Sequence, residues 1–482
     1  MKKIPMHPYL KIITLGCKVN QSESEALAAQ GDTASAGNPE SGSFGTCVIN
    51  TCCVTARAAM QSRQAIRRAI RRHPDATIVV TGCYAQMKPN EIRDIAGVNH
   101  IVGQADKHRL FDLIRQEHPS APNSSFSFRG PEKLRGETLF TQMPSPAFGQ
   151  RTRPFLKVQD GCNAFCSYCI VPYSRGRSRS LTPEKALDEM DGLIRKGARE
   201  IVVTGIHLGR WGGDLDGSPD LCVLLDTLLS HPKLGRLRLS SLEPTEITEA
   251  VLDRIGSDPR ICRHFHIPLQ SGDATVLKRM NRHYDPGEFA GTIGRIRGRF
   301  KNAAIGADVM VGFPGESEEA FENTRKLIES LPVTYLHVFP FSPRPPAPAA
   351  SYPDRVPPDV VRERARILKD LGRQKKAAFY ASMTGRVLEV IGETPSDADG
   401  FCCKGLSSNY IPVYIHPNEK PTSADALVNR LIRCRITGAD SWLSVAGIPE
   451  DQENVNDTTA PRQDAVNPDA GEFMREHPVR SY

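Results

Sequence analysis

Apolar and polar residues alternate along most of the chain in short blocks that predict β-strands separated by helices. In the N-terminal quarter, apolar runs at 11–16, 46–50 and 77–82 predict three strands. The segment 56–73 places apolar residues three or four positions apart, which is typical of an amphipathic helix. Strands that alternate with crossover helices form a parallel sheet, so 9–125 is predicted to be a flavodoxin-like α/β domain.

The same alternation resumes near residue 150 and continues for six units. The expected strands are 154–160, 200–208, 237–244, 264–270, 304–314 and 335–343. Six successive βα units predict a partial TIM-like (β/α)6 barrel over 148–356. Ligands of such barrels bind at the carboxyl ends of the strands, so the functional face is expected there.

The C-terminal part of the chain changes pattern twice. Residues 357–382 are charged and have helical spacing, which predicts a helical linker. From 383 to 448 the alternation has period two and is broken by Gly, Asn and Asp, which predicts a small β-barrel. The remainder, 449–482, is polar with few large apolar residues, as is typical of a disordered tail.

Composition limits the class of protein further. The net charge of +7 permits a polyanionic partner without requiring one. No apolar run reaches membrane-spanning length, and the first residues lack the apolar stretch of a signal peptide. We therefore expect a cytoplasmic protein without membrane contact. Thirteen cysteines are an odd number, and a reducing compartment favours metal or cluster ligation over disulfides.

Three of these cysteines have a spacing that predicts a reactive metal centre. Cys162, Cys166 and Cys169 follow the first barrel strand as Cys-x-x-x-Cys-x-x-Cys. Three thiolates at this spacing can hold a cubane iron–sulfur cluster and leave its fourth iron open to a ligand. The alternative is a structural zinc site, but such sites normally take four protein ligands. The next Cys or His residues downstream are His207 and Cys222.

A second set of cysteines follows the N-terminal strands. Cys17, Cys52 and Cys83 each come directly after, or within two residues of, the end of one strand. The carboxyl ends of parallel strands share one edge of a sheet, so these thiols can converge there. A single buried Cys is usually a small core residue, but three at equivalent positions favour a second cluster. Cys53 is the alternative to Cys52 as a ligand.

These motifs carry a family resemblance. The segment around Cys162, with Tyr168 before the last cysteine, resembles the signature of the radical S-adenosylmethionine enzymes. TLGCKVN, VINTC and VVTGCYAQ resemble the N-terminal domain of the methylthiotransferases, and the C-terminal barrel resembles their TRAM module. Across 9–447 the chain is most similar to the branch that modifies N6-threonylcarbamoyladenosine at tRNA position 37. It departs from the family pattern at the Cys52-Cys53 doublet and at Pro346-Ala347, where Gly-Thr is usual.

The resemblance implies two 4Fe-4S clusters and S-adenosylmethionine as cofactors. Cys162, Cys166 and Cys169 would hold the cluster whose open iron binds S-adenosylmethionine, which reduction would cleave to methionine and a 5′-deoxyadenosyl radical. The auxiliary cluster would be held by Cys17, Cys52 and Cys83. Residues near the strand ends would line the S-adenosylmethionine pocket, namely Tyr168, Thr204, Gly205, Ser241, Glu243, His266, Gln270 and Asp308.

The implied reaction is methylthiolation at C2 of that adenosine, with the tRNA anticodon stem-loop as partner. A flavodoxin- or ferredoxin-type reducing system and a sulfur donor would also be needed, and the protein is expected to be a monomer. Arg175, Arg177 and Arg179 beside the cluster motif are expected to contact RNA phosphates. Alternatives are a methylthiotransferase for N6-isopentenyladenosine in tRNA or for an Asp of a ribosomal protein. A non-catalytic iron–sulfur RNA-binding protein is the alternative from another class.

Overall fold

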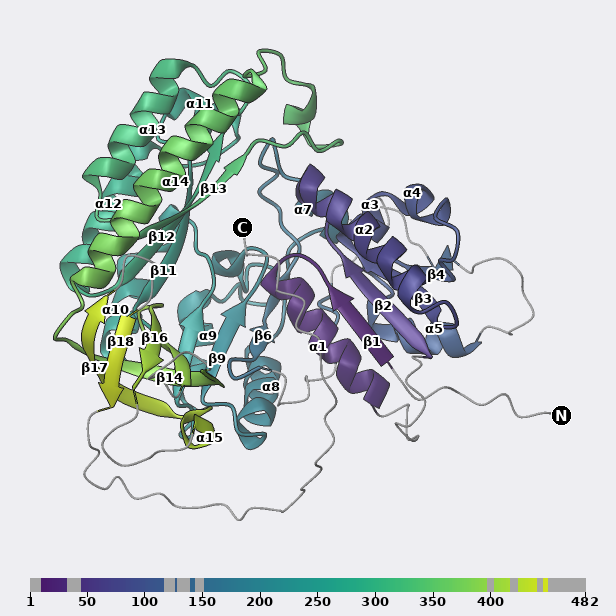
Figure 1. Cartoon of the computed structure of the whole chain (residues 1–482), viewed down its shortest axis with the longest axis horizontal. Coiled ribbons are helices and arrows are strands. Elements are labelled where there is room, and N and C mark those ends of the chain that lie inside the picture. Colours follow the sequence, from purple (N-terminus) through teal and green to yellow (C-terminus); the bar gives the residue numbers. More distant parts are fainter. Residues whose placement is uncertain are drawn as a thin grey trace.

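The computed structural model shows an N-terminal sheet, a curved central set of strands and a small C-terminal barrel (Figure 1). The described residues are 10–32, 45–116, 126–127, 139–143, 151–396, 403–416, 424–439 and 445–449. The tail expected from residue 449 onward lies outside them, apart from residue 449 itself. Within the described ranges, no helix combines the length and the apolar character needed to cross a bilayer.

The N-terminal sheet is parallel, and its strands follow one another across the sheet in chain order. They are β1 (Leu10–Thr14), β2 (Thr46–Thr51), β3 (Thr77–Gly82), β4 (His100–Val102) and β5 (Phe126–Ser127). The helices are α1 (Lys18–Asp32), α2 (Ala56–Arg72), α3 (Cys83–Met87), α4 (Pro89–Arg93) and α5 (Leu110–Gln116), with a 3-10 turn at Lys107–Arg109. The three expected strands are confirmed, and the strand order differs from the 2-1-3-4-5 order of flavodoxin itself.

Helix α2 illustrates how local sequence sets these elements. The side chain of Thr55 accepts a hydrogen bond from the Ala58 amide and so caps the first turn. Ile66 and Ala69 face the sheet and are buried, whereas Arg72 lies in the last turn, where the helix dipole favours a cation. The position of α2 fixes Cys52, because the Ser62 hydroxyl bonds both backbone groups of that cysteine.

The six strands expected in the central unit are all present and parallel. They are β6 (Phe155–Lys157), β9 (Glu200–Thr204), β10 (Arg236–Leu239), β11 (His264–Gln270), β12 (Ala304–Val311) and β13 (Tyr335–Pro340). The sheets β10-β9-β6 and β11-β12-β13 meet through a parallel bridge between Leu237 and Ile261. The partial α/β barrel is therefore confirmed.

Alternate residues of these strands face outward and form the main core. Ile201 and Val203 of β9 and Ile305 of β12 are fully buried against the outer helices. These helices are α8 (Pro183–Arg195), α9 (Leu221–Leu229), α10 (Glu249–Ser257), α11 (Ala274–Arg279), α12 (Pro286–Arg299) and α13 (Glu318–Ser330). The short helix α7 (Val171–Arg175) and the strand pair β7 (Gln159–Asp160) and β8 (Arg179–Ser180) frame the cysteine loop. The opposite strand faces carry the polar residues described below.

The helix α14 (Pro358–Ala381) follows the barrel and packs along β13. Ala365 and Leu368 are buried in the core shared with the barrel, and Gly372 brings the helix close to Leu336. The segment is therefore a docked helix that closes one side of the barrel wall.

The C-terminal unit is a closed five-stranded barrel. Its elements are β14 (Val387–Pro395), β15 (Cys403–Ser407), β16 (Pro412–Ile415), α15 (Ala424–Leu427), β17 (Leu431–Ala439) and β18 (Val445–Pro449). Cys403 and Cys434 are buried in its core with Val390 and Val413. The barrel also meets the central unit through Tyr410, which stacks on His264 at 4.1 Å between ring centroids.

Two buried arginines of β10 hold the C-terminal barrel against the central unit. Arg236 donates to the Leu406 carbonyl at 3.0 Å, and Arg238 donates to the Ser407 carbonyl at 2.9 Å. Both guanidinium groups also pair with Glu200, which is fully buried. Burial would raise the pKa of Glu200, but Arg238 and Arg236 lower it to about 2.

We predict that Glu200→Gln lowers the free energy of unfolding by about 3–5 kcal/mol, because Arg236 and Arg238 lose their buried counter-charge. In the wild type this stabilisation is present above the ordinary Glu pKa of about 4.3 and is lost as pH falls toward 2. Anaerobic thermal unfolding at several pH values measures both effects. The control is Glu389→Gln, an exposed partner of Arg236 that should change stability by about 1 kcal/mol or less. Equal effects of the two variants would contradict the prediction.

Candidate active site

The first cysteine set lies on a loop at the carboxyl-terminal side of β6 and β7. Gly161 opens this loop with φ +73°, and an added Cβ would lie 1.8 Å from the Arg177 carbonyl oxygen. Only glycine fits this turn. The Cys162 amide then bonds the Gly176 carbonyl at 3.1 Å, and the Cys169 amide bonds the Cys166 carbonyl at 2.9 Å. These bonds fold the loop back on itself and bring its thiols together.

The three thiols fit a group that takes three thiolates. Burial raises the pKa of Cys169, and the neighbouring Cys166 and Cys162 raise it further. As a free thiol Cys169 would therefore stay protonated at neutral pH, whereas a bound metal centre deprotonates its ligands and relieves the repulsion between them. Cys166 is only 8% exposed, and the other two are partly exposed, which leaves an open side for a further ligand.

Two residues that the sequence pattern did not single out approach these thiols. His207 Nδ1 lies 3.4 Å from Cys162 Sγ, and its Nε2 lies 2.8 Å from Glu246 Oε1. Arg282 donates to Cys166 Sγ at 3.3 Å and pairs with Glu243. Hydrogen bonds to cluster sulfurs tune the reduction potential of such a centre. His207 could be recognised only as a strand-end residue after β9, and Arg282 only as a cation after α11.

The predicted S-adenosylmethionine contacts fall into two groups. Glu243 is joined to the cysteine loop through Arg282, and Gly205 approaches closely because an added Cβ would lie 2.9 Å from the Gln159 side chain. Thr204 and Gln270 are the last residues of β9 and β11, and Tyr168 lies within the cysteine loop. Gln270 Oε1 is buried without a partner among the described residues. Ser241 is exposed.

His266 and Asp308 form a separate cluster with His337 on the inner faces of β11, β12 and β13. Asp308 Oδ1 lies 2.9 Å from His266 Nε2 and 3.2 Å from His337 Nδ1. Although burial raises it, the pKa of Asp308 stays below its usual value because the two imidazoles stabilise the carboxylate. Tyr335 orients His266 through a 3.1 Å hydrogen bond to Nδ1. The ligand-type atoms of this His266–Asp308–His337 cluster lie within 4.8 Å of one another.

The second cysteine set lies at the carboxyl edge of the N-terminal sheet. Cys52 and Cys83 are buried, and an added Cβ on Gly16 would lie 2.9 Å from Cys52 Sγ, which brings the turn before Cys17 against Cys52. Cys17 is exposed to solvent, but the protein around its thiol excludes enough water to raise its pKa. Arg175 lowers this pKa, and Cys83 raises it further. The structure thus brings Cys17, Cys52 and Cys83 together.

Cys53 is less well placed than Cys52 for this set. Cys52 interacts electrostatically with both Cys83 and Cys17, whereas the main interactions of Cys53 are with Cys83 and Cys52. Cys53 packs into the same apolar core cluster as Cys83, whereas Cys52 is not part of that cluster. The arrangement favours Cys52 as the third thiol.

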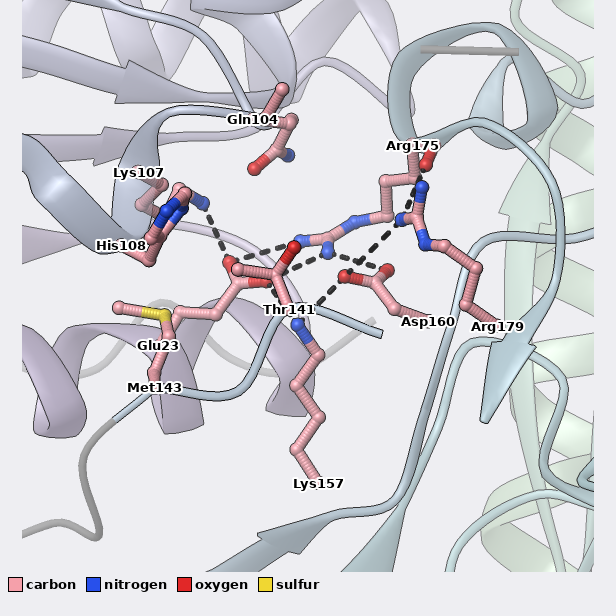
Figure 2. A pocket seen from close by; sticks show the side chains of 11 residues that line it. Glu23, Gln104, Lys107, His108, Thr141, Met143, Lys157, Asp160, Arg175 and Arg179 are labelled. Atoms are coloured by element: carbon pink, nitrogen blue, oxygen red, sulfur yellow. Dashed lines mark hydrogen bonds and ion pairs between the residues drawn. The ribbon is translucent and has the colours of Figure 1, made fainter. Parts of the chain in front are cut away.

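A buried charge network joins the two cysteine sets. Figure 2 shows Glu23, Lys107, Lys157, Asp160 and Arg175 pointing toward one another in the lining of a small pocket. Arg175 donates to Glu23 Oε1 and Asp160 Oδ1, both at 2.9 Å, and Lys157 pairs with the same two carboxylates. The network ties α1 of the N-terminal unit to the loop that carries the first cysteine set.

This network corrects the expectation for the basic stretch. Arg175 is 1% exposed, and its terminal nitrogens bond Glu23, Asp160 and the Asn20 side chain, so they are not presented to an RNA phosphate. Arg179 is also buried and donates to the Arg175 carbonyl at 2.9 Å. Arg177 is exposed.

Comparison with known proteins agrees with this geometry. Residues 156–328 match the model of the radical SAM superfamily, and residues 9–103 match that of the uncharacterized protein family UPF0004. The chain is 37% identical to the threonylcarbamoyladenosine tRNA methylthiotransferase MtaB of Bacillus subtilis, over 88% of this chain and 93% of that protein. It is 32% identical to a tRNA-2-methylthio-N(6)-dimethylallyladenosine synthase of Clostridium botulinum, over 80% and 86% of the two chains.

A solved structure supports the fold independently. The radical S-adenosylmethionine methyltransferase TsrM from Kitasatospora setae superposes with a TM-score of 0.51 at 15% identity, covering 88% of this chain and 85% of that one. The cysteine geometry, the fold and the sequence relatives agree. The chain therefore belongs to the methylthiotransferase family of radical S-adenosylmethionine enzymes, which use iron–sulfur clusters and S-adenosylmethionine to transfer a sulfur-containing group.

Proposed function

We propose that this chain methylthiolates C2 of N6-threonylcarbamoyladenosine at position 37 of tRNA. The observation that carries the proposal is the pair of three-cysteine sets joined by the buried network around Arg175. Such an arrangement suits one centre that activates S-adenosylmethionine and a second that supplies sulfur. The relatives named for threonylcarbamoyladenosine, at 37% and 35% identity, support this substrate over others.

In this proposal, Cys162, Cys166 and Cys169 hold one 4Fe-4S cluster, and Cys17, Cys52 and Cys83 hold an auxiliary one. When bound, the first supplies the electron that cleaves S-adenosylmethionine, and the auxiliary one supplies sulfur. His207 and Arg282 hydrogen-bond two of the first set of thiolates and hold them in place. We place the S-adenosylmethionine pocket at Tyr168, Thr204, Gly205, Ser241, Glu243 and Gln270. His266 and Asp308, expected there from the sequence, are left out of it because they form a separate cluster with His337.

The RNA contacts belong to the surface around this mouth. An anticodon-loop base is unpaired and can be splayed into a pocket, which suits a site at the barrel mouth. Exposed Arg177 and the C-terminal barrel are the proposed contacts for the anticodon stem-loop. A flavodoxin- or ferredoxin-type reductant and a sulfur donor complete the cytoplasmic reaction, with the protein acting as a monomer.

The rival functions are separable. Membership of an enzyme family removes the non-catalytic alternative and the structural zinc site. A methylthiotransferase for isopentenyladenosine remains the nearest rival, because the chain is 32% identical to a relative named for the dimethylallyladenosine product. No residue described here favours a ribosomal protein Asp as substrate.

The experiment that tests the proposal is mass spectrometry of tRNA nucleosides from a deletion strain. We expect loss of 2-methylthio-N6-threonylcarbamoyladenosine and accumulation of its unmethylthiolated precursor, both reversed by the wild-type chain. Loss of the 2-methylthio isopentenyl nucleoside instead would assign the rival function. An unchanged nucleoside profile would refute a tRNA substrate.

A further inference from the structure

The inner faces of β11, β12 and β13 carry a group of polar side chains. The His266–Asp308–His337 cluster lies there, with Asp308 accepting from both imidazoles. The side chains of Asp308 and His337 are 25% and 29% exposed, so the cluster meets solvent rather than core. His337 uses Nδ1 for Asp308, and its Nε2 makes no hydrogen bond with any residue that the structure describes.

Lys18 brings a positive charge to the same place from the other unit. It is the first residue of α1, directly after Cys17, and α1 packs against β6. Burial, Arg238 and Arg153 lower the pKa of its ammonium group to about 8, although Asp308 and Cys17 raise it. Within the described ranges Lys18 forms no ion pair, while Asp308 pairs with two imidazoles. Lys18 therefore contributes a positive charge, next to Cys17 in the chain, that has no ion-pair partner among the described residues.

The chemistry of adenine places its N6 substituent near these groups. C2 and N6 lie on the same Watson–Crick edge of the base, separated by C6 and N1. If sulfur reaches C2 from the set containing Cys17, the N6 substituent on the same edge of the base also lies on the side of that set. Lys18 follows Cys17 in the chain and interacts electrostatically with both Cys17 and Asp308, so it lies between that set and the cluster.

We propose that Lys18 and the His266–Asp308–His337 cluster form the binding subsite for the N6 substituent of the target base. The inference rests on the proposed function and assigns which residues read its substrate. Lys18 pairs with the carboxylate of the threonylcarbamoyl group, and His337 Nε2 bonds its hydroxyl. Asp308 fixes the orientation of both imidazoles. An isopentenyl group offers none of these partners and would leave the same polar groups desolvated and unpaired, so the subsite discriminates against it.

The test measures binding of three anticodon stem-loops that differ only at N6 of position 37. These carry unmodified adenosine, threonylcarbamoyladenosine or isopentenyladenosine, and fluorescence anisotropy with cluster-loaded protein gives each Kd. We expect the wild type to prefer the threonylcarbamoyl loop over the unmodified one by about 10-fold. Lys18→Met and His337→Phe should each reduce that ratio to about 2-fold or less, whereas Lys18→Arg should keep most of it. Iron content and circular dichroism confirm that each variant is folded and loaded.

The outcomes separate the subsite from the proposed function. The subsite is overturned if Lys18→Met and His337→Phe both keep the wild-type preference for the threonylcarbamoyl loop. The two residues come from different elements, and the proposal requires each of them to contact the N6 substituent. Turnover of the wild type on the same RNAs tests the function itself. Methylthiolation of only the isopentenyl loop by the wild type overturns the proposed function, and with it this assignment.

Discussion

Replacing Cys162, Cys166 or Cys169 by alanine, one at a time, is expected to reduce S-adenosylmethionine cleavage by ~10³-fold or more, equivalent to ~4 kcal/mol in the activation barrier. The loop around Gly161 brings the three thiols to one place, and no other cysteine thiol is hydrogen-bonded into that loop within the part of the chain described. A cubane cluster with one open iron needs three thiolate ligands, and each variant leaves only two. The measurement is 5′-deoxyadenosine released by anaerobically reconstituted, reduced protein.

Cys222→Ala is the matched control for these variants. Its thiol lies on α9, is partly exposed and is remote in sequence from both cysteine sets. It should cleave S-adenosylmethionine at the wild-type rate and bind the same iron. Each variant of the first set should bind about four fewer irons per chain. Wild-type cleavage by the Cys166 variant would rule out the assignment of this set.

The elements and both cysteine sets could be read from the sequence because their signals are local. Period-two runs and helical spacing predicted β1, β2, β3 and the six barrel strands, all of which are present. The cysteines could be placed at one sheet edge because chain order alone puts Cys17, Cys52 and Cys83 after successive parallel strands. Strand-end positions need no knowledge of side-chain packing.

The long-range pairs could not be read in this way. Arg175 looked like part of an RNA-binding stretch because its neighbours are basic, but its partner Glu23 lies 152 residues away on α1. His207 likewise reaches Cys162 only because β9 pairs with β6. Lys18 could not be recognised from the sequence, because a lysine at the start of a helix is common and its neighbours in the barrel become known only from the fold. Which side chains form hydrogen bonds or ion pairs between distant parts of the chain depends on tertiary packing, and a local sequence pattern holds no information on that packing.

The second large effect concerns the N-terminal set. Cys17→Ala or Cys83→Ala is expected to leave S-adenosylmethionine cleavage within about 3-fold of the wild type and to lower methylthiolated product by ~10²-fold or more. The reason is spatial: these thiols belong to the N-terminal sheet edge, whereas the first set has its own loop and its own hydrogen bonds. Parallel assays of 5′-deoxyadenosine and of methylthiolated anticodon stem-loop, on one preparation, measure both quantities.

Cys53→Ala supplies the internal control, because Cys53 neighbours Cys52 in the chain but packs in the apolar core. It should keep most of the product and most of the iron, whereas Cys52→Ala should behave like Cys17→Ala. Loss of product in Cys53→Ala but not in Cys52→Ala would make Cys53 the third ligand, and the assignment of two clusters would stand. Native product formation by both Cys17→Ala and Cys83→Ala would instead remove the second cluster. Sulfur would then have to come from elsewhere, and the proximity of Lys18 to Cys17 would lose its meaning for the substrate.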